Sequence, residues 1–386
     1  MANKKISALD NNTTYSATET YLAIVDENDT TQAASGSNFK SLKNDFTGDV
    51  SVNNIKLSTF TDNQAILLGD IPPSLATGLD QIIIGKGSYL NNDGLGAFGD
   101  FGMILIGNNS ANRAAASLGY ESIIIGHNTL NKTASTQAYR QSVFVGSDIL
   151  ATTSDARAES TVAIGFEALE RAVRALSGVY VGRAAGSYGD SEECVMIGAY
   201  AGYGTSSSLR DDAVYIGYRS GYAATGHKTT YIGRESGEYV SGENNVAIGW
   251  QALQSSSSSG NMIDNVAVGQ RALTLVEGNS NVALGNYAGG LLTTGDNNII
   301  IGSVTSDIPT TMSDTLVIGR DSKIRIFADD NGLAIGGNNI TPTEALDVTG
   351  TVTANKYIVE DYASLNFGDD TAAAAGGVPL GGLYHD

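Results

Sequence analysis

The sequence predicts an all-β chain that coils as a parallel β-roll or β-helix solenoid of about 16 short rungs. Three observations carry this prediction. Three apolar residues followed by glycine recur along the chain at intervals of 16 to 22 residues; these apolar residues are mostly β-branched or aromatic; and Gly, Asn and Asp cluster between the motifs. A constant minimum interval with occasional longer ones is typical of a solenoid whose surface loops vary in length.

The motif occurs sixteen times, and one copy departs from the apolar pattern only by beginning with Thr230. Its glycines are Gly69, Gly85, Gly107, Gly126, Gly146, Gly165, Gly182, Gly198, Gly217, Gly233, Gly249, Gly269, Gly285, Gly302, Gly319 and Gly336. Runs such as IIIG, VFVG and VYIG favour a strand over a helix. Neighbouring side chains of a strand point to opposite faces, so strands that are apolar at every position predict cover on both faces. One cover is the interior of the coil, and the other is a separate body.

A small residue recurs three positions after the glycine. It is Ala, Ser or Thr in thirteen of the sixteen copies. A periodic small residue indicates the close approach of another backbone, so we expect these positions to pack against neighbouring chains of a homotrimer. The predicted trimer-packing residues are Ala168, Ala185, Ala201, Ser220, Ser236, Ala252, Ala272 and Ala288.

The intervals between glycines predict which segments belong to the coil. The segment EALERAVRALS (167–177) has helical propensity and spacing, but only 17 residues separate Gly165 from Gly182. That interval favours a rung, since tertiary context overrides propensity, and a small protruding helix is the alternative. Longer intervals predict projecting loops at 86–102, 108–121, 127–141, 203–212 and 254–264.

The composition excludes several classes of protein. The chain of 386 residues has a formal net charge of −19, which argues against a phosphate-binding surface and against a nucleic-acid partner. The first 30 residues lack the pattern of a secretory signal, and no apolar run approaches the length of a membrane span, so no membrane insertion is expected. The single cysteine, Cys194, excludes an intrachain disulfide framework.

The sequence offers little catalytic chemistry. His127, His227 and His385 each stand alone, without a nearby Ser or Cys partner that resembles a triad, and are expected as solvated turn residues. Adjacent carboxylates on a strand point to opposite faces, which is poor geometry for an acid/base pair. Acidic turns such as TGDNN could hold calcium but have no fixed ligand spacing. We therefore expect no enzyme activity, cofactor or metal site. The paired carboxylates are Asp211–Asp212, Asp329–Asp330 and Asp369–Asp370.

Aromatic residues gather at and after the glycines. Tyr outnumbers Phe, 18 to 9, and several aromatic residues directly follow a motif glycine. An exposed row of aromatic rings could stack on sugar rings of a receptor; alternatively, the rings pack on one another across rungs. The candidate receptor-contact residues are Trp250, Tyr218, Tyr203, Tyr222 and Tyr239.

The repeats resemble a known family. The series NNVAIGWQAL, NVAVGQRAL and NVALGNYAGGLLTTGDNNIIIG is similar to the head repeats of trimeric autotransporter adhesins, and more closely to related repeats in bacteriophage tail fibres. The resemblance covers about residues 66–337. It implies three chains wound side by side as a parallel β-roll about a threefold axis. The missing secretory signal disfavours an adhesin.

The resemblance also implies a division of the chain. Residues 1–45 are expected as a small leader domain that attaches to the virion, 46–65 as a transition segment, 66–337 as the β-roll shaft and 338–386 as a C-terminal β tip or collar.

The expected function follows from the same resemblance. The chain is expected to be a structural virion fibre, located in the virion, that mediates host-cell attachment as a homotrimer. Its receptor would be a surface glycan or protein, and residues 1–45 would bind a phage tail or capsid protein. The alternatives are a capsid-attached fibre or decoration protein, and a polysaccharide-degrading tailspike.

Overall fold

The computed structural model describes residues 65–68, 81–85, 102–110, 121–130, 139–150, 157–204, 208–255, 262–303, 308–320, 323–336, 342, 345–349 and 352–353. These residues form an all-β parallel solenoid of about 12 turns, without a helix among them. The all-β class and the parallel solenoid predicted from the sequence are thereby confirmed, while the count of about 16 rungs and the trimer stay predictions. The predicted leader (1–45), nearly all of the transition segment and most of the C-terminal tip or collar lie outside the described residues.

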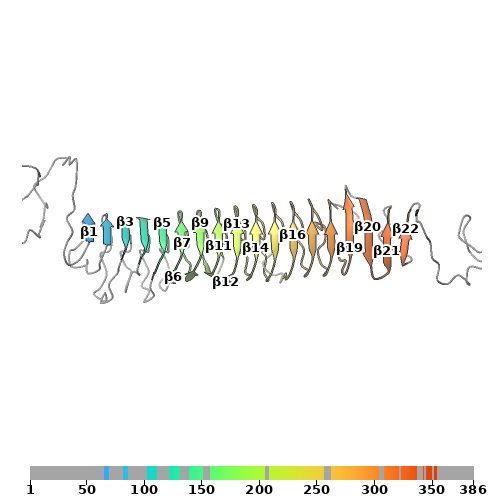
Figure 1. Cartoon of the computed structure of the whole chain (residues 1–386), viewed down its shortest axis with the longest axis horizontal. Helices are drawn as coiled ribbons and strands as arrows, with labels where there is room; N and C mark the ends of the chain where they lie inside the picture. Colours follow the sequence, from blue (N-terminus) through green and yellow to red (C-terminus); the bar gives the residue numbers. More distant parts are fainter. Residues whose placement is uncertain are drawn as a thin grey trace, which may run out of the picture.

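The strands before the glycines stack into one long sheet. Each strand pairs in parallel with the strand of the next turn, and equivalent motif residues face each other, as Val246 does with Val266 and Ala247 with Ala267. Figure 1 shows these strands side by side along the whole coil. The parallel strands are β1 (Ala65–Leu68), β2 (Gln81–Ile84), β3 (Ile104–Asn108), β4 (Ile123–His127), β5 (Val143–Ser147), β7 (Val162–Ile164), β9 (Val179–Val181), β11 (Val195–Ile197), β13 (Val214–Ile216), β14 (Thr230–Ile232), β15 (Val246–Ile248), β16 (Val266–Val268), β17 (Val282–Leu284), β18 (Ile299–Ile301) and β19 (Leu316–Arg320).

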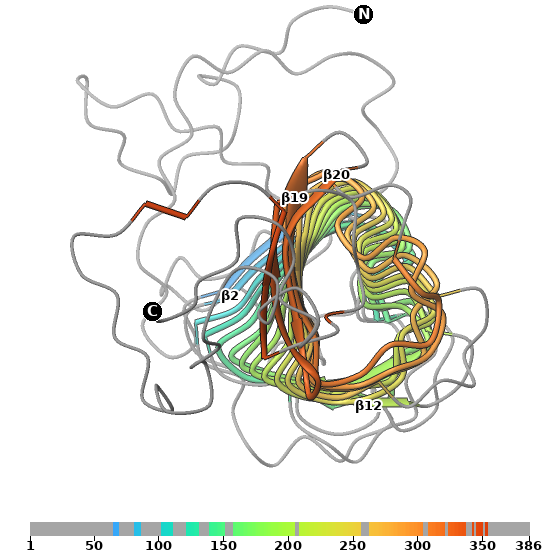
Figure 2. The same cartoon turned by 90° about the vertical axis from the view of Figure 1, so that its right-hand side faces the viewer.

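A shorter sheet occupies another wall of the coil. Its strands also pair in parallel, in the order β12, β10, β8, β6. Viewed along the coil, the turns superimpose into a ring, with β19 in one wall and β12 in another (Figure 2). The four strands are β6 (Arg157–Glu159), β8 (Arg174–Leu176), β10 (Gly189–Glu192) and β12 (Ser208–Asp211).

The regular stacking ends at an antiparallel hairpin. Strand β20 (Lys323–Asp329) pairs antiparallel with β19, and β21 (Gly332–Ile335) pairs antiparallel with β20. The sixteenth motif therefore lies in this hairpin and does not continue the parallel stack. The last described strand, β22 (Leu346–Val348), pairs in parallel with β21.

The motif glycines are required by close stacking. At Gly249 the backbone φ is +133°, and a Cβ atom would lie 2.6 Å from the carbonyl oxygen of Gly269 in the next turn. An L-residue would meet both an unfavourable φ and a backbone clash there. The glycine thus lets the chain bend out of the sheet without separating the turns.

The interior is filled by matching large and small side chains across the coil. From β3 to β19, the middle residue of each apolar triplet before the glycine is fully buried. Where that residue is Tyr231, the position four after the glycine is Gly237, and a Cβ there would lie 2.3 Å from the Tyr231 ring. Where it is Ala247, the same position is Leu253. In these two turns a large strand residue thus packs with glycine and a small one with leucine, as close packing of the interior requires.

Buried asparagines form a polar ladder inside the coil. The carboxamide Nδ2 of Asn281 donates to Oδ1 of Asn265 at 3.2 Å and to the carbonyl oxygen of Gly295 at 2.9 Å. Its Oδ1 accepts from N and Nδ2 of Asn298 at 3.1 and 2.9 Å. Asn245 begins the same series. Each residue satisfies backbone groups of the adjacent turn, as buried polar groups require.

The small residues three positions after the motif glycines were predicted to contact other chains, and this prediction is wrong because their side chains point into the coil. All eight are fully buried within a single chain, where they face the interior of the coil. The hydroxyl of Ser236 donates to the carbonyl oxygen of Ala247 in the next turn at 2.8 Å. Small side chains are needed because opposite walls of the coil approach each other. The residues that were predicted to pack between chains and instead lie inside the coil are Ala168, Ala185, Ala201, Ser220, Ser236, Ala252, Ala272 and Ala288.

Residues 167–177 and 203–212 both belong largely to the coil. Residues 167–177 form a turn of the coil and contain β8, so the rung is confirmed over the helix. The predicted loop at 203–212 is partly wrong, because β12 belongs to the second sheet and Arg210 in it is fully buried. Much of the other four predicted loops lies outside the described residues.

Candidate functional site

The outer face of the long sheet is an uncovered apolar surface. From β3 to β19, the first and third residues of the apolar triplet before the glycine point outward and are mostly Ile, Val or Leu. Their exposed fractions are large for apolar residues, for example 38% at Ile248, 51% at Leu284 and 44% at Ile299. Because they recur on every turn, they form two continuous columns along the coil. Contiguous apolar patches of this kind indicate a contact surface.

A second row of side chains, the corner column, stands one residue after the motif glycine. It comprises Phe166, Arg183, Tyr218, Arg234 and Trp250. The rings of Phe166, Tyr218 and Trp250 are 44%, 44% and 42% exposed. The guanidinium of Arg183 lies 5.8 Å from the Phe166 ring centre, and that of Arg234 lies 5.6 Å from the Tyr218 ring centre. Arg183 and Arg234 therefore each stack on the ring of the preceding turn, and Ala199 separates Arg183 from Tyr218 in the column.

A third row, the tyrosine ladder, lies beyond the next bend. It comprises Tyr188, Tyr203, Tyr222 and Tyr239 on successive turns. The centres of neighbouring rings are 5.1, 5.3 and 5.8 Å apart, and the rings of Tyr203 and Tyr222 are nearly parallel. Burial raises the pKa of the Tyr203 phenol to about 12, with a further contribution from Tyr188. The sequence left open whether these rings stack on sugars or pack on each other; in the structure they pack on each other, stacked at Tyr203–Tyr222 and edge-on at Tyr222–Tyr239.

Arginines and carboxylates hold the tyrosine ladder in place. The guanidinium of Arg219 lies 4.1 Å from the Tyr222 ring centre and forms a 2.6 Å ion pair with Glu238. Burial raises the pKa of the Glu238 carboxyl, against the opposing hydrogen bond from Gln254 and the charge of Arg219. The hydroxyl of Tyr239 also accepts a hydrogen bond from Arg219 at 3.3 Å, so these contacts fix the ladder along its length.

The pKa of the neighbouring Glu235 carboxyl is shifted downward. Burial alone would raise the pKa of Glu235, but hydrogen bonds from Gln251 and Arg234 lower it below its usual value. The Oε2 atom of Glu235 accepts from Nε2 of Gln251 at 2.8 Å. Glu235 is thus a fixed anion between the corner column and the tyrosine ladder.

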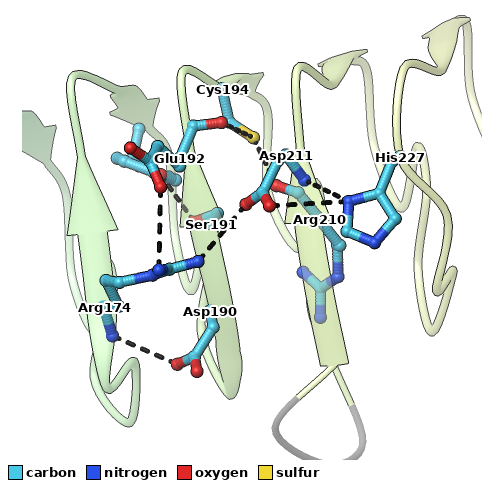
Figure 3. A network of polar contacts seen from close by, with 9 residues as sticks. Arg174, Asp190, Ser191, Glu192, Cys194, Arg210, Asp211 and His227 are labelled. Carbon is cyan, nitrogen blue, oxygen red and sulfur yellow. Dashed lines mark hydrogen bonds and ion pairs between the residues drawn. The ribbon is translucent and has the colours of Figure 1, made fainter.

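The second sheet carries a network of charged residues on its outer surface (Figure 3). The guanidinium of Arg174 lies 3.6 Å from Glu192 and 3.7 Å from Asp211, and its backbone N–H donates to Asp190 at 3.1 Å. These contacts cross from one turn of the coil to the next. They are partly exposed ion pairs, whose contribution to stability is small.

His227 extends this network but does not form a catalytic dyad. Its Nδ1 accepts the backbone N–H of Asp211 at 3.2 Å, while the Asp211 carboxylate lies 3.6 Å from the same atom. In a catalytic dyad, the Nδ1–H group of the histidine instead donates a hydrogen bond to the carboxylate that orients the ring. The expectation that His227 is a structural turn residue agrees with this geometry.

The interior beneath the network contains a buried arginine. Arg210 points into the coil, where Nε donates to the carbonyl oxygen of Ala224 at 3.1 Å and Nη1 donates to the carbonyl oxygen of Gly202. Gly189 leaves room for the guanidinium. Burial lowers the pKa of Arg210 and raises the pKa of the neighbouring Cys194 thiol to about 11. Such a thiol is protonated near neutral pH and therefore unreactive.

The structure describes two of the three predicted carboxylate pairs. Asp211 joins the charged network while Asp212 is exposed at the adjacent bend. Asp329 accepts the backbone N–H of Asn331 at 2.9 Å, which fits the tight turn between β20 and β21. Among the described residues, no three metal-ligating side chains lie close enough together to hold a metal ion. The third carboxylate pair, Asp369–Asp370, and His385 lie outside the residues that the structure describes.

Sequence reasoning identified the aromatic residues but missed the arginines between them. Arg183, Arg219, Arg234 and Arg271 all stand one or two residues after a motif glycine. Arg271 lies 5.1 Å from the Trp250 ring centre. Their spacing relative to the glycines was the signal that could have placed them beside the rings.

No family model, curated protein or solved structure matches the chain in the comparisons with known proteins. Within the described part of the chain, no helix has the length and apolar character needed to cross a lipid bilayer. The surfaces described above therefore provide the grounds for assigning a function.

Proposed function

We propose that this chain forms the shaft of a homotrimeric virion fibre that attaches a bacteriophage to its host cell. The observation that supports this proposal most is the uncovered apolar face of the long sheet. About 12 turns at ~4.8 Å each, with two outward columns, make a face about 60 Å long and roughly 10 Å wide, or about 600 Å² in projection. A face of that size lies at the upper end of the range for the largest apolar patch of a soluble monomer, and such patches are often functional.

Identical chains are the partners that fit this face best. The face is as periodic as the chain itself, so a second copy running in the same direction presents matching columns on every turn. A closed cyclic arrangement covers the face of each chain, whereas an open one would propagate without limit. The resemblance of the repeats to trimeric fibre proteins favours three chains.

The tyrosine ladder and the loops of the longer intervals are the proposed attachment surface. A rigid rod with repeated hydroxyl groups suits weak contacts to a surface glycan or protein. Three chains and several fibres per particle would strengthen such contacts by raising the effective concentration. Residues 1–45 would bind the tail or capsid.

The test combines location with binding. A labelled antibody against the chain should decorate fibres on the particle in electron micrographs, and the purified chain should compete with particles for adsorption to cells. Absence of the chain from the particle would overturn the proposal. Release of new reducing ends from host polysaccharide by the purified chain would instead support the tailspike alternative.

A further inference from the structure

We infer that the corner column is part of the interface between chains, and that the opposite edge of the same sheet in a second copy of this chain contacts it. The inference rests on the proposed function, because it requires the chains to associate side by side. It reassigns Tyr218 and Trp250, predicted from the sequence as receptor contacts, to the subunit interface.

The first reason is that the corner column continues the apolar face. In β3, β4 and β5 the strand runs through the glycine and includes the next residue, so this position belongs to the sheet. In the later turns, Trp250 stands two residues after Ile248, whose side chain points outward. The exposed fractions of Trp250 and Ile248 are 42% and 38%. The corner column therefore stands directly beside the apolar face in the sequence of each turn.

The second reason is the chemistry of the column. Aromatic residues and arginine are enriched at the centres of protein interfaces, where they contribute most of the binding energy. Arg234 also donates to Glu235 at 3.0 Å, which fixes its guanidinium beside the Tyr218 ring. Because these side chains are already ordered, a partner would lose little rotamer entropy in binding them.

The third reason is the charge of the opposite edge of the sheet. From β3 to β19, the residue two positions before each strand of the long sheet is exposed and has a positive φ, for example 56° at Glu193, 57° at Asp212 and 59° at Asp264. This acidic edge also includes Glu121 and Asp314, with Lys228 as its basic member; its other members are uncharged. One edge of the sheet thus presents arginines and rings, and the other presents five carboxylates and one lysine among uncharged residues.

Side-by-side packing of parallel chains brings these unlike edges together. When identical chains run parallel around a common axis, each contributes one edge to one neighbour and its other edge to the other neighbour. The corner column of one chain then faces the acidic edge of the next. An antiparallel pair related by rotation about the strand direction would instead place like edges, and like charges, against each other.

Trp250 is the single tryptophan of the chain and reports on this interface directly. We expect acrylamide to quench its fluorescence roughly threefold less in the assembled full chain than in the chain denatured by guanidinium. Equal quenching in the two states, in a particle that sedimentation finds to be assembled, would overturn the inference and leave the proposed function intact. A folded monomer would overturn both.

Charge reversal provides the second measurement. Arg183→Glu with Arg234→Glu should weaken assembly at least about tenfold, because like charges would then face each other. Adding Glu193→Arg and Asp212→Arg to the same chain should restore assembly at least in part. Arg171→Glu is the matched control, since Arg171 is exposed but stacks on Tyr188 in the tyrosine ladder. Circular dichroism checks that each variant folds; wild-type assembly of the folded double variant would overturn the inference.

Discussion

Removing one member of the asparagine ladder should destabilise the whole coil. Asn281→Ala deletes the donor to the partly buried carbonyl of Gly295 and the acceptor for the buried N–H of Asn298. Each buried polar group that loses its partner costs about 1–3 kcal/mol, so the free energy of unfolding should fall by about 2–5 kcal/mol. The corresponding fall in the thermal midpoint is roughly 4–10 °C for a chain of this size.

The assay is thermal unfolding followed by far-ultraviolet circular dichroism. The matched control is Asn286→Ala, because Asn286 is exposed and does not have a positive φ. The control should change the free energy of unfolding by no more than about 0.5 kcal/mol. Equal midpoints for the two variants would refute the argument that the ladder satisfies buried backbone groups inside the coil.

Three other perturbations test the packing of the coil. Gly249→Ala should lower the free energy of unfolding by about 2–4 kcal/mol, through φ strain and the clash with the next turn; Gly102→Ala, where φ is +67° and the nearest atom is 3.7 Å away, should cost only about 1–2 kcal/mol in thermal unfolding. Ala252→Trp should disrupt the coil itself, since Ala252 is fully buried, and should abolish the native circular dichroism spectrum rather than merely yield folded monomers. Burial raises the pKa of Tyr215 to about 12 and that of Tyr231 further, so stability is complete below pH ~10 and falls as the pH rises above it. Tyrosinate absorbance should therefore lag at pH 10–12 and rise together with unfolding; a smooth titration of all tyrosines in the folded chain would contradict this.

The sequence predicted the coil because each turn repeats one short pattern. Strand, glycine and turn cluster recur with a fixed minimum spacing, and parallel stacking in register follows from that repetition. The repeat did not predict that the small residue three positions after the glycine points into the coil. Deciding it requires the pairing of Tyr231 with Gly237 and of Ala247 with Leu253, which shows that this segment lines the interior of the coil.

The surfaces were less predictable than the coil. Stacking of Tyr203 on Tyr222 depends on a turn-to-turn spacing that local sequence does not encode, so both readings of the aromatic residues stayed open. The second sheet was missed because β12 contains the charged residues Arg210 and Asp211, which an exposed loop would also contain. Burial of an arginine inside a coil contradicts the usual preference of charged residues for solvent.

The mass of the purified chain in solution tests the central claim most directly. One chain has a mass of 40.0 kDa. Sedimentation equilibrium should give three times that mass, because the apolar face of the long sheet requires cover along its whole length. A stable, folded particle with the mass of a single chain would contradict the account.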